Sequence, residues 1–336
     1  MRTALGVGCA VAVAACCGCE RVGQAVDSMR PAQPPAVVQR APLEDQLPEP
    51  VRPVPPWESL VEPDVLFSLE DWDKASPAVK EAAARHVAER LPIFTYAGLD
   101  RFSSGGKTHE VALFQHTRTG LGFVLVPAGR FVMGSPATEA ARSFDEVRRN
   151  VTLTRPFLIC RTEVSQRAWG TVRGENPSHF PGEDLPIETV TMLDVERFLI
   201  RAKLELPTEA QWEYACRAGT TGVYGFGDAQ GLDEHAWYDA NAGGRTHPVG
   251  QKKPNAFGLF DVHGNVLEWC RDGYDVPTEV DVTDPEGLAG AGDRVVRGGS
   301  WQNAATVLRS AFRLRTHPGD KQAGIGFRPV KVLPAP

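Results

Sequence analysis

Apolar residues recur at four-residue spacing between Ser76 and Leu91. This spacing predicts an amphipathic helix in which Ser76 caps the N-terminus and Pro77 takes the first turn. One face of such a helix must pack against a larger body. The stripe on that face consists of Val79, Ala83, Val87 and Leu91.

Polar and apolar residues alternate over 110–116, and after a turn at 117–120 an apolar run covers 123–126. These patterns are typical of β-strands, so the two segments are predicted to form a hairpin that leads into the main domain. The helix and the hairpin together make a small lead-in over residues 57–117.

From Gly122 onward the chain is rich in Gly, Pro and Trp, which predicts short strands, few helices and long irregular loops. Two helices are predicted, over 193–202 and 208–217. In the second, Thr208 is the N-cap and Glu209 lies in the first turn, where the helix dipole favours a carboxylate. No repeat of about 20 to 50 residues is visible, which disfavours a propeller or a solenoid.

The first residues have the pattern of a secretory signal. Met1-Arg2 precede a small apolar run, and four of the seven cysteines lie in the first nineteen residues. The run is shorter than the ~20 apolar residues needed to span a bilayer. Val13-Ala14-Ala15-Cys16 looks like a bacterial lipobox, in which the thiol after the small residues becomes the lipid-bearing N-terminus. Residues 1–15 are therefore a predicted signal peptide and Cys16 the predicted lipid anchor, with Cys17 or Cys19 as alternatives.

Residues 16–56 are rich in proline and almost free of aromatic residues. Such a segment cannot bury enough apolar surface to fold, so it is predicted to be a disordered tether. A lipid and a tether predict an exported protein that is anchored to a membrane at the bacterial cell envelope. The formal net charge of -6, with no basic stripe, argues against a nucleic-acid partner.

Nine sequence blocks that follow one another resemble the formylglycine-generating enzyme (sulfatase-modifying factor) family. The resemblance covers about residues 118 to 332 and implies an α+β fold for residues 118–333. This fold is the family's loop-rich variant of the C-type lectin fold. The blocks are 123–135, 163–165, 176–178, 206–219, 254–261, Gly264-Asn265-Val266-Leu267-Glu268-Trp269, Arg297-Gly298-Gly299-Ser300-Trp301, Arg309-Ser310-Ala311-Phe312-Arg313 and Gly326-Phe327-Arg328.

The best-known members of this family oxidise a sulfatase cysteine to formylglycine with molecular oxygen and a copper(I) ion held by two thiolates. Soft thiolate ligands are what copper(I) requires. The resemblance places the first thiolate at the position of Asn303, and no cysteine occurs after Cys270. Copper is therefore not expected. Ser300 and Asn303 stand at family active-site positions, and the sequence leaves open whether the chain is an enzyme.

Some relatives use other oxidative chemistry, including non-haem iron held by histidines. The eight histidines of this chain show no close pair with a carboxylate at helical metal-ligand spacing. In the exported part, Cys216 and Cys270 are a candidate disulfide, with Cys160 buried as a small hydrophobic residue. In relatives the position of Cys216 pairs with a cysteine where this chain has Ser310.

The resemblance also implies a structural calcium site. Its ligands would be the Asp261 and Glu268 carboxylates and the Gly264 and Val266 carbonyls, a set of hard oxygen donors that suits calcium. The alternative is a hydrogen-bonded turn without metal. A second family calcium site survives only in part, at Asn241 and Ala242.

The family's substrate groove retains an aromatic residue, amides and guanidinium groups. This combination is a candidate peptide or sugar platform, because Trp supplies rigid contact area and Arg supplies paired donors. The alternative is that both arginines pair with core carboxylates and that the tryptophan packs in the fold. The candidate residues are Trp301, Gln302, Asn303, Arg309 and Arg313.

Three functions follow as hypotheses. The first is an envelope-anchored family member without copper-dependent cysteine oxidation that binds a peptide, sugar or protein ligand. The second is an oxidase that acts on a protein cysteine or another thiol by a non-standard site. The third is a structural component of an envelope complex.

Overall fold

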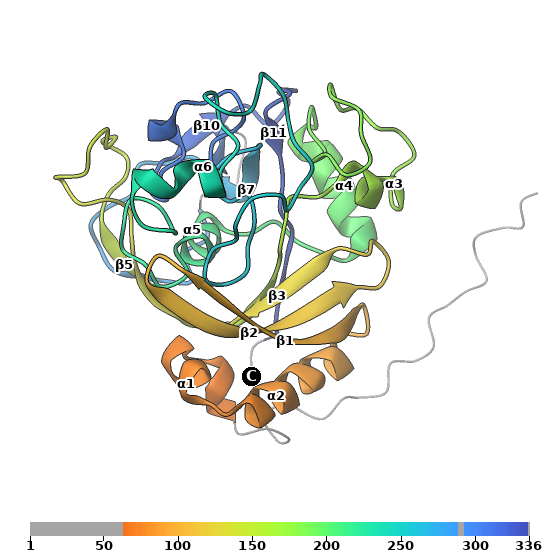
Figure 1. Cartoon of the computed structure of the whole chain (residues 1–336), viewed down its shortest axis with the longest axis vertical. Coiled ribbons are helices and arrows are strands. Elements are labelled where there is room, and N and C mark those ends of the chain that lie inside the picture. The colour runs from red at the N-terminus through yellow and green to blue at the C-terminus, as the bar shows by residue number, and fades with distance from the viewer. Residues whose placement is uncertain (1–62, 288–291, 335–336) are drawn as a thin grey trace, which may run out of the picture. The chain divides into compact units, whose positions relative to one another are not determined.

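The computed structural model describes residues 63–287 and 292–334, which are coloured in Figure 1. The predicted signal peptide at 1–15, the lipid anchor at Cys16 and the tether at 16–56 lie outside these residues.

The predicted lead-in helix is confirmed as α2, Pro77–Arg90, which follows the short helices η2, Pro63–Leu66, and α1, Leu69–Lys74. The Ser76 hydroxyl accepts a hydrogen bond from the Val79 N–H, as an N-cap does. Ala83 and Val87 are buried, whereas the Val79 side chain at the start of the expected stripe is exposed. The Trp72 indole of α1 donates to the Glu110 carbonyl at 2.7 Å and fastens the helices to the sheet.

These helices lie against a five-stranded antiparallel sheet with the order β1-β2-β3-β6-β12, which separates them from the rest of the fold in Figure 1. The first three strands are β1, Phe94–Ser104, at one edge, then β2, Lys107–His116, and β3, Gly122–Val126. The sheet continues with β6, Phe157–Cys160, and ends at the other edge with β12, Val330–Val332.

The predicted hairpin is confirmed, since β2 pairs with β3 from Leu113 opposite Val124 to Gln115 opposite Gly122. Strand β1 was not predicted because its alternation breaks at Ala97, where the register with β2 shifts. The lead-in therefore shares one sheet with strands from the far end of the chain.

Two smaller sheets and four helices complete the α+β, loop-rich fold that the sequence predicts. One sheet has the order β10-β9-β7-β11 and the other β4-β5-β8. Their strands are β10, Leu314–Thr316, β9, Arg294–Arg297, β7, Leu267–Gly273, β11, Ile325–Gly326, β4, Gly129–Met133, β5, Arg149–Leu153, and β8, Val282–Thr283. The helices are α3, Gln166–Gly170, α4, Met192–Ala202, α5, Glu209–Arg217, and α6, Leu232–His235, with the short turns η3, Ala229–Gly231, and η4, Ala305–Val307.

Both predicted helices of the main domain are confirmed within one residue, as α4 and α5. Each begins with a reciprocal capping box, at Thr191 with Asp194 and at Thr208 with Gln211. None of the helices in the described part of the chain is long and apolar enough to cross a membrane.

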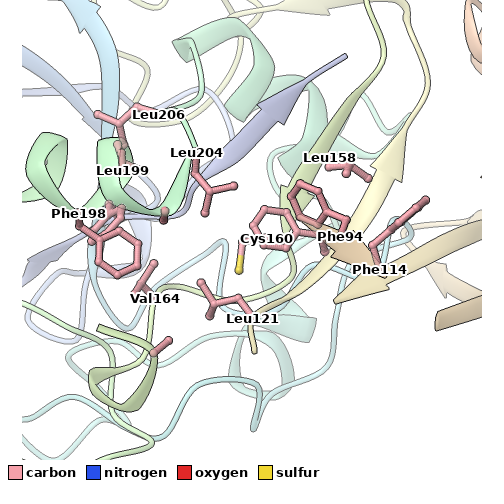
Figure 2. Packing of buried hydrophobic residues seen from close by; sticks show 14 of the residues in the cluster. Phe94, Phe114, Leu121, Leu158, Cys160, Val164, Phe198, Leu199, Leu204 and Leu206 are labelled. Atoms are coloured by element: carbon pink, nitrogen blue, oxygen red, sulfur yellow. The ribbon is translucent and has the colours of Figure 1, made fainter. Parts of the chain in front are cut away.

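Phe198 of α4 is a fully buried member of the larger hydrophobic cluster. Its ring stacks on Trp169 of α3 at 5.3 Å and meets Phe327 edge-on at 5.4 Å, so it joins two helices to the C-terminal segment. Figure 2 shows Phe198 with other members of this cluster, and it shows Cys160 among apolar side chains.

Replacing Phe198 with Ala should lower the free energy of unfolding by about 3–5 kcal/mol, because the side chain is fully buried and its loss leaves a cavity. Ile200→Ala on the same helix is the matched control, since its side chain is 77% exposed and should change stability by less than about 0.5 kcal/mol. Urea unfolding followed by tryptophan fluorescence would compare the two. Equal effects would contradict this assignment of the core.

Candidate functional site

A glycine turn carries the residues at the family's expected active-site positions. Strand β9 ends at Arg297, and Gly298 and Gly299 then adopt positive φ values of 92° and 75°. The positive φ of Gly299 favours glycine, and a Cβ there would also lie 2.8 Å from the Leu308 side chain. The turn delivers Ser300 to the interior of the site, where its side chain is fully buried.

The Asn303 side chain closes this turn. Its Oδ1 accepts hydrogen bonds from the Ser300 hydroxyl at 2.7 Å and from the Ser300 backbone N–H at 2.9 Å. The Asn303 carbonyl in turn accepts the Asp239 N–H at 3.1 Å. Asn303 thus holds the Ser300 hydroxyl in place. Its amide oxygen is occupied by two hydrogen bonds from Ser300.

The site does not fit a copper(I) ion, because the described residues bring no thiolate pair to it. Cys160, Cys216 and Cys270 are free and completely buried. Burial raises the pKa of the Cys160 thiol to about 11 and that of Cys216 to about 12, and it raises the pKa of Cys270 well above its usual value. All three thiols are therefore protonated at neutral pH.

The candidate disulfide between Cys216 and Cys270 is absent from the structure, so that expectation was wrong. The Cys216 sulfur on α5 faces the His263 Nε2 at 3.6 Å, whereas the nearest hydrogen-bond partner of the Cys270 sulfur is the Glu268 carbonyl at 4.0 Å. Spacing along the chain did not reveal that the two thiols face different partners. The expected burial of Cys160 is confirmed.

The buried His263 forms its hydrogen bonds within the fold. The His263 Nε2 accepts the Gly225 N–H at 3.0 Å, and its Nδ1 lies 2.7 Å from the Leu308 carbonyl. Burial lowers the pKa of His263 to about 4, so the ring is neutral. Across residues 63–287 and 292–334, no three His, Cys, Asp or Glu side chains are grouped so that they could hold a metal ion.

The expected calcium ligands are only partly available. Glu268 is completely buried, and both its oxygens already accept hydrogen bonds from the Arg328 guanidinium at 2.7–3.1 Å. The Trp212 indole donates a further hydrogen bond to Glu268 at 2.7 Å. Glu268 therefore does not fit as a calcium ligand, because its charge and lone pairs are taken by a buried arginine.

Asp261 is the one expected carboxylate with a free oxygen. Its Oδ2 accepts the Gly250 N–H at 2.6 Å, while its buried Oδ1 has no partner among the described residues. Burial raises the pKa of Asp261 to about 6. The neighbouring Glu163 accepts the Val266 N–H at 2.9 Å, and burial with the Asp261 charge raises its pKa well above the usual value. The four expected ligands thus do not form a complete calcium set.

The partial second calcium site is also used internally. The Asn241 Oδ1 accepts the Tyr238 N–H at 3.0 Å, and the Ala242 carbonyl lies 2.8 Å from the His247 Nε2. Both oxygens that were expected to bind calcium are therefore taken by the turn.

Arg309 and Arg313 lie in the interior rather than on a platform. Arg309 pairs with Glu146 at 2.6 Å and with Glu139 at 2.7 Å. Arg313 grips both oxygens of Glu209 at 2.6 and 2.8 Å. The structure therefore contains the alternative arrangement, in which both guanidinium groups pair with core carboxylates.

Trp301 and Gln302 do reach the surface. The Trp301 indole donates to the Ala323 carbonyl at 3.0 Å, and its ring meets Phe180 edge-on at 5.5 Å. The exposed Arg245 guanidinium lies over the Phe180 ring at 5.7 Å. We call Phe180, Arg245, Trp301 and the exposed Gln302 the Trp301 surface. Its aromatic faces and amide and guanidinium donors can bind a peptide or a sugar.

Phe180 and Arg245 were missed by the sequence analysis. They lie on the loops after α3 and α6, far from Trp301 in the chain. The only signal was that Phe180 closely follows the block at 176–178, and nothing in the sequence indicated Arg245.

One family model and several curated proteins match this chain. Residues 110–333 match the family model described as the sulfatase-modifying factor enzyme 1-like domain. The chain is 28% identical over 279 residues to the chaperone protein LppX of Paenibacillus barcinonensis, which covers 66% of this chain and 90% of LppX. It is 34% identical over 162 residues to the formylglycine-generating enzyme of Streptomyces coelicolor, covering 43% of this chain and 51% of that enzyme.

Among solved structures, PvdO of Pseudomonas aeruginosa superposes with a TM-score of 0.59 at 28% identity. The match covers 69% of this chain and all of PvdO.

Replacing Arg328 with Met should destabilise the protein by about 3–5 kcal/mol, because the Glu268 charge would remain buried without its ion-pair partner. The matched control is Lys253→Met, which removes an ion pair with Glu234 whose two side chains are more than half exposed and should cost less than about 1 kcal/mol. Chemical unfolding of both variants would measure the difference. An Arg328→Met variant as stable as the control would show that the Glu268–Arg328 ion pair does not stabilise the fold.

Native protein should resist alkylation at its three buried thiols, because each is shielded and protonated. Treatment with iodoacetamide, followed by digestion and mass spectrometry, should leave Cys160, Cys216 and Cys270 unmodified, and the same treatment in denaturant should modify all three. Rapid labelling of any of them in the native state would reveal a reactive thiol and would favour an activity that uses a thiol of this chain.

Proposed function

This chain belongs to the sulfatase-modifying factor family and shares its formylglycine-generating-enzyme variant of the C-type lectin fold, and from that membership we propose that it is a ligand- or partner-binding module without copper-dependent cysteine oxidation. The observation that carries the proposal is the Asn303 side chain. The resemblance implies a copper-binding thiolate at this position. In this chain the position holds an amide oxygen, which accepts a hydrogen bond from the Ser300 hydroxyl. An amide cannot replace a thiolate as a copper(I) ligand or attack a substrate thiol.

The buried cysteines support the same proposal. Binding of copper(I) by cysteine requires thiolates at an accessible site, and Cys160, Cys216 and Cys270 have raised pKa values in a closed interior. The five residues between Asn303 and Arg309 contain no cysteine.

The Trp301 surface is the part of the family groove that we propose as the ligand site. Trp301 is held rigid by its indole hydrogen bond and by the Phe180 ring, so it can bind without a large loss of side-chain entropy. Gln302 and Arg245 place polar donors beside the rings. A peptide or sugar with both apolar and polar faces would be complementary to this combination.

We further propose that the module acts at the bacterial cell envelope, anchored by a lipid on Cys16 and extended by residues 16–56. The name of the LppX relative, a chaperone, is in keeping with a partner-binding role. Because the chain spans about half of the Streptomyces coelicolor enzyme, that enzyme's activity is not transferred to it.

The full chain, mixed with copper, oxygen and a cysteine-containing sulfatase peptide, should leave the peptide mass unchanged, because the described residues bring no thiolate pair to the Asn303 position. The Streptomyces coelicolor enzyme, tested in parallel, is the positive control for thiol-to-aldehyde conversion. Aldehyde formation by this chain would overturn the proposal and favour an oxidase with a non-standard site.

The binding half of the proposal is tested by a photo-crosslinking residue at Gln302, with the same residue at the exposed Arg101 as the matched control. Crosslinks in native membranes should form from position 302 and decrease when Trp301 is also changed to Ala. Equal crosslinking from both positions, or no effect of Trp301→Ala, would contradict a ligand site on the Trp301 surface.

A further inference from the structure

A second cleft lies away from the Trp301 surface, at the opposite end of the β7–β9 ladder. In that ladder Glu268 pairs with Arg297, next to the Ser300 turn, whereas Gly273 pairs with Arg294 at the far end. The cleft opens beside Gly273 and has a volume of about 230 Å³. The side chains that matter for its chemistry are Met133, Arg149, Glu209, Asp272, Pro277 and Arg313.

Arg149 is the unusual residue of this cleft. It is half-buried at the start of β5, where pairing with Met133 of β4 fixes its backbone. Within the described part of the chain no carboxylate lies within 4.0 Å of its guanidinium, and its buried Nε has no hydrogen-bond partner. A partly desolvated cation with an unpaired buried donor is costly, so such a group favours an anionic ligand.

The other buried arginines differ from Arg149 in this respect. Arg297, Arg309 and Arg313 each contact at least one buried carboxylate. Each of these three buried arginines is therefore in direct contact with a carboxylate, whereas among residues 63–287 and 292–334 Glu209, Glu213 and Asp272 act on Arg149 only from a distance.

Three of the four acidic side chains that line the cleft are engaged by protein donors, and the fourth, Asp275, is exposed and accepts the Val276 N–H at 2.8 Å. Arg313 holds both oxygens of Glu209, and Asp272 accepts the Glu209 and Gly287 backbone N–H groups at 2.8 and 2.9 Å. Glu286 pairs with Arg271 at 2.7 Å. These contacts direct the carboxylates toward other donors and leave the Arg149 guanidinium for a ligand.

We propose that Arg149 anchors a binding site for the carboxylate of a small, partly apolar molecule, such as a short acyl amino acid or the C-terminus of a peptide. The guanidinium fork matches a planar carboxylate and can bind it through two parallel hydrogen bonds. Met133, Ala210, Pro277 and Pro285 line the same cleft and suit a short apolar group, and the volume limits the ligand to a small one. This site shares no residue with the Trp301 surface, so it does not rest on the function proposed above.

The test uses the full chain and ligand-observed NMR titration with N-acetylalanine, its uncharged amide and inorganic phosphate. N-acetylalanine should bind the wild type and Arg148→Gln, the matched control at the exposed neighbouring arginine. Its affinity for Arg149→Gln should be at least about tenfold lower, as expected for loss of a charge-assisted pair. The amide should not bind.

A stability measurement keeps the test decisive. Because Arg149 has no ion-pair partner in the described protein, Arg149→Gln should keep or raise Tm, whereas Arg313→Gln should lower it by removing the two hydrogen bonds that Arg313 donates to the buried Glu209. Failure of N-acetylalanine to bind the wild type, or equal affinity for Arg149→Gln, would overturn the proposal. Binding of phosphate alone would overturn the carboxylate assignment, and a large loss of Tm in Arg149→Gln would show that the arginine is structural.

Discussion

The buried ion pair between Glu268 and Arg328 is the contact on which the main domain depends. Both side chains have no exposed surface, so their charges are compensated only by each other and by neighbouring hydrogen bonds. Arg328 also donates to the Cys160 and Phe260 carbonyls at 3.0 and 2.8 Å, and Glu268 accepts the Trp212 indole. One pair thus joins β6, β7, helix α5 and the C-terminal segment, in a fold that has little regular secondary structure to hold these parts together.

The same constraint explains why residues that resembled ligands have other roles. A loop-rich domain must satisfy many buried backbone groups, and charged or amide side chains do so here. Asn303 holds the Ser300 turn, and Arg309 and Arg313 bind carboxylates and carbonyls of the loops that they support. The two sites that we propose for ligands are the Trp301 surface and the Arg149 cleft.

Local patterns predicted the parts of the fold that local physics controls. Helices α2 and α5 begin at the predicted caps Ser76 and Thr208, α4 begins one residue before its predicted start, and the β2–β3 hairpin follows its alternation. Strand β1 escaped prediction because a bulge breaks its period. The disulfide was wrong for a different reason: the direction in which Cys216 points is set by packing of α5 against His263, and no spacing along the chain encodes that direction.

The sequence by itself determined the family, the α+β class, the capped helices and the absence of a cysteine after Cys270. These features depend on residue identity and on neighbours within a few positions, so they can be predicted without coordinates. Only the tertiary structure decided which polar groups are already paired and which are free. Glu268 pairs with a residue 60 positions away and Arg313 with one 104 positions away, whereas Arg149 has no acidic partner in the described part of the chain. Free and paired arginines look alike in sequence, because pairing depends on distances that arise only when remote segments pack together.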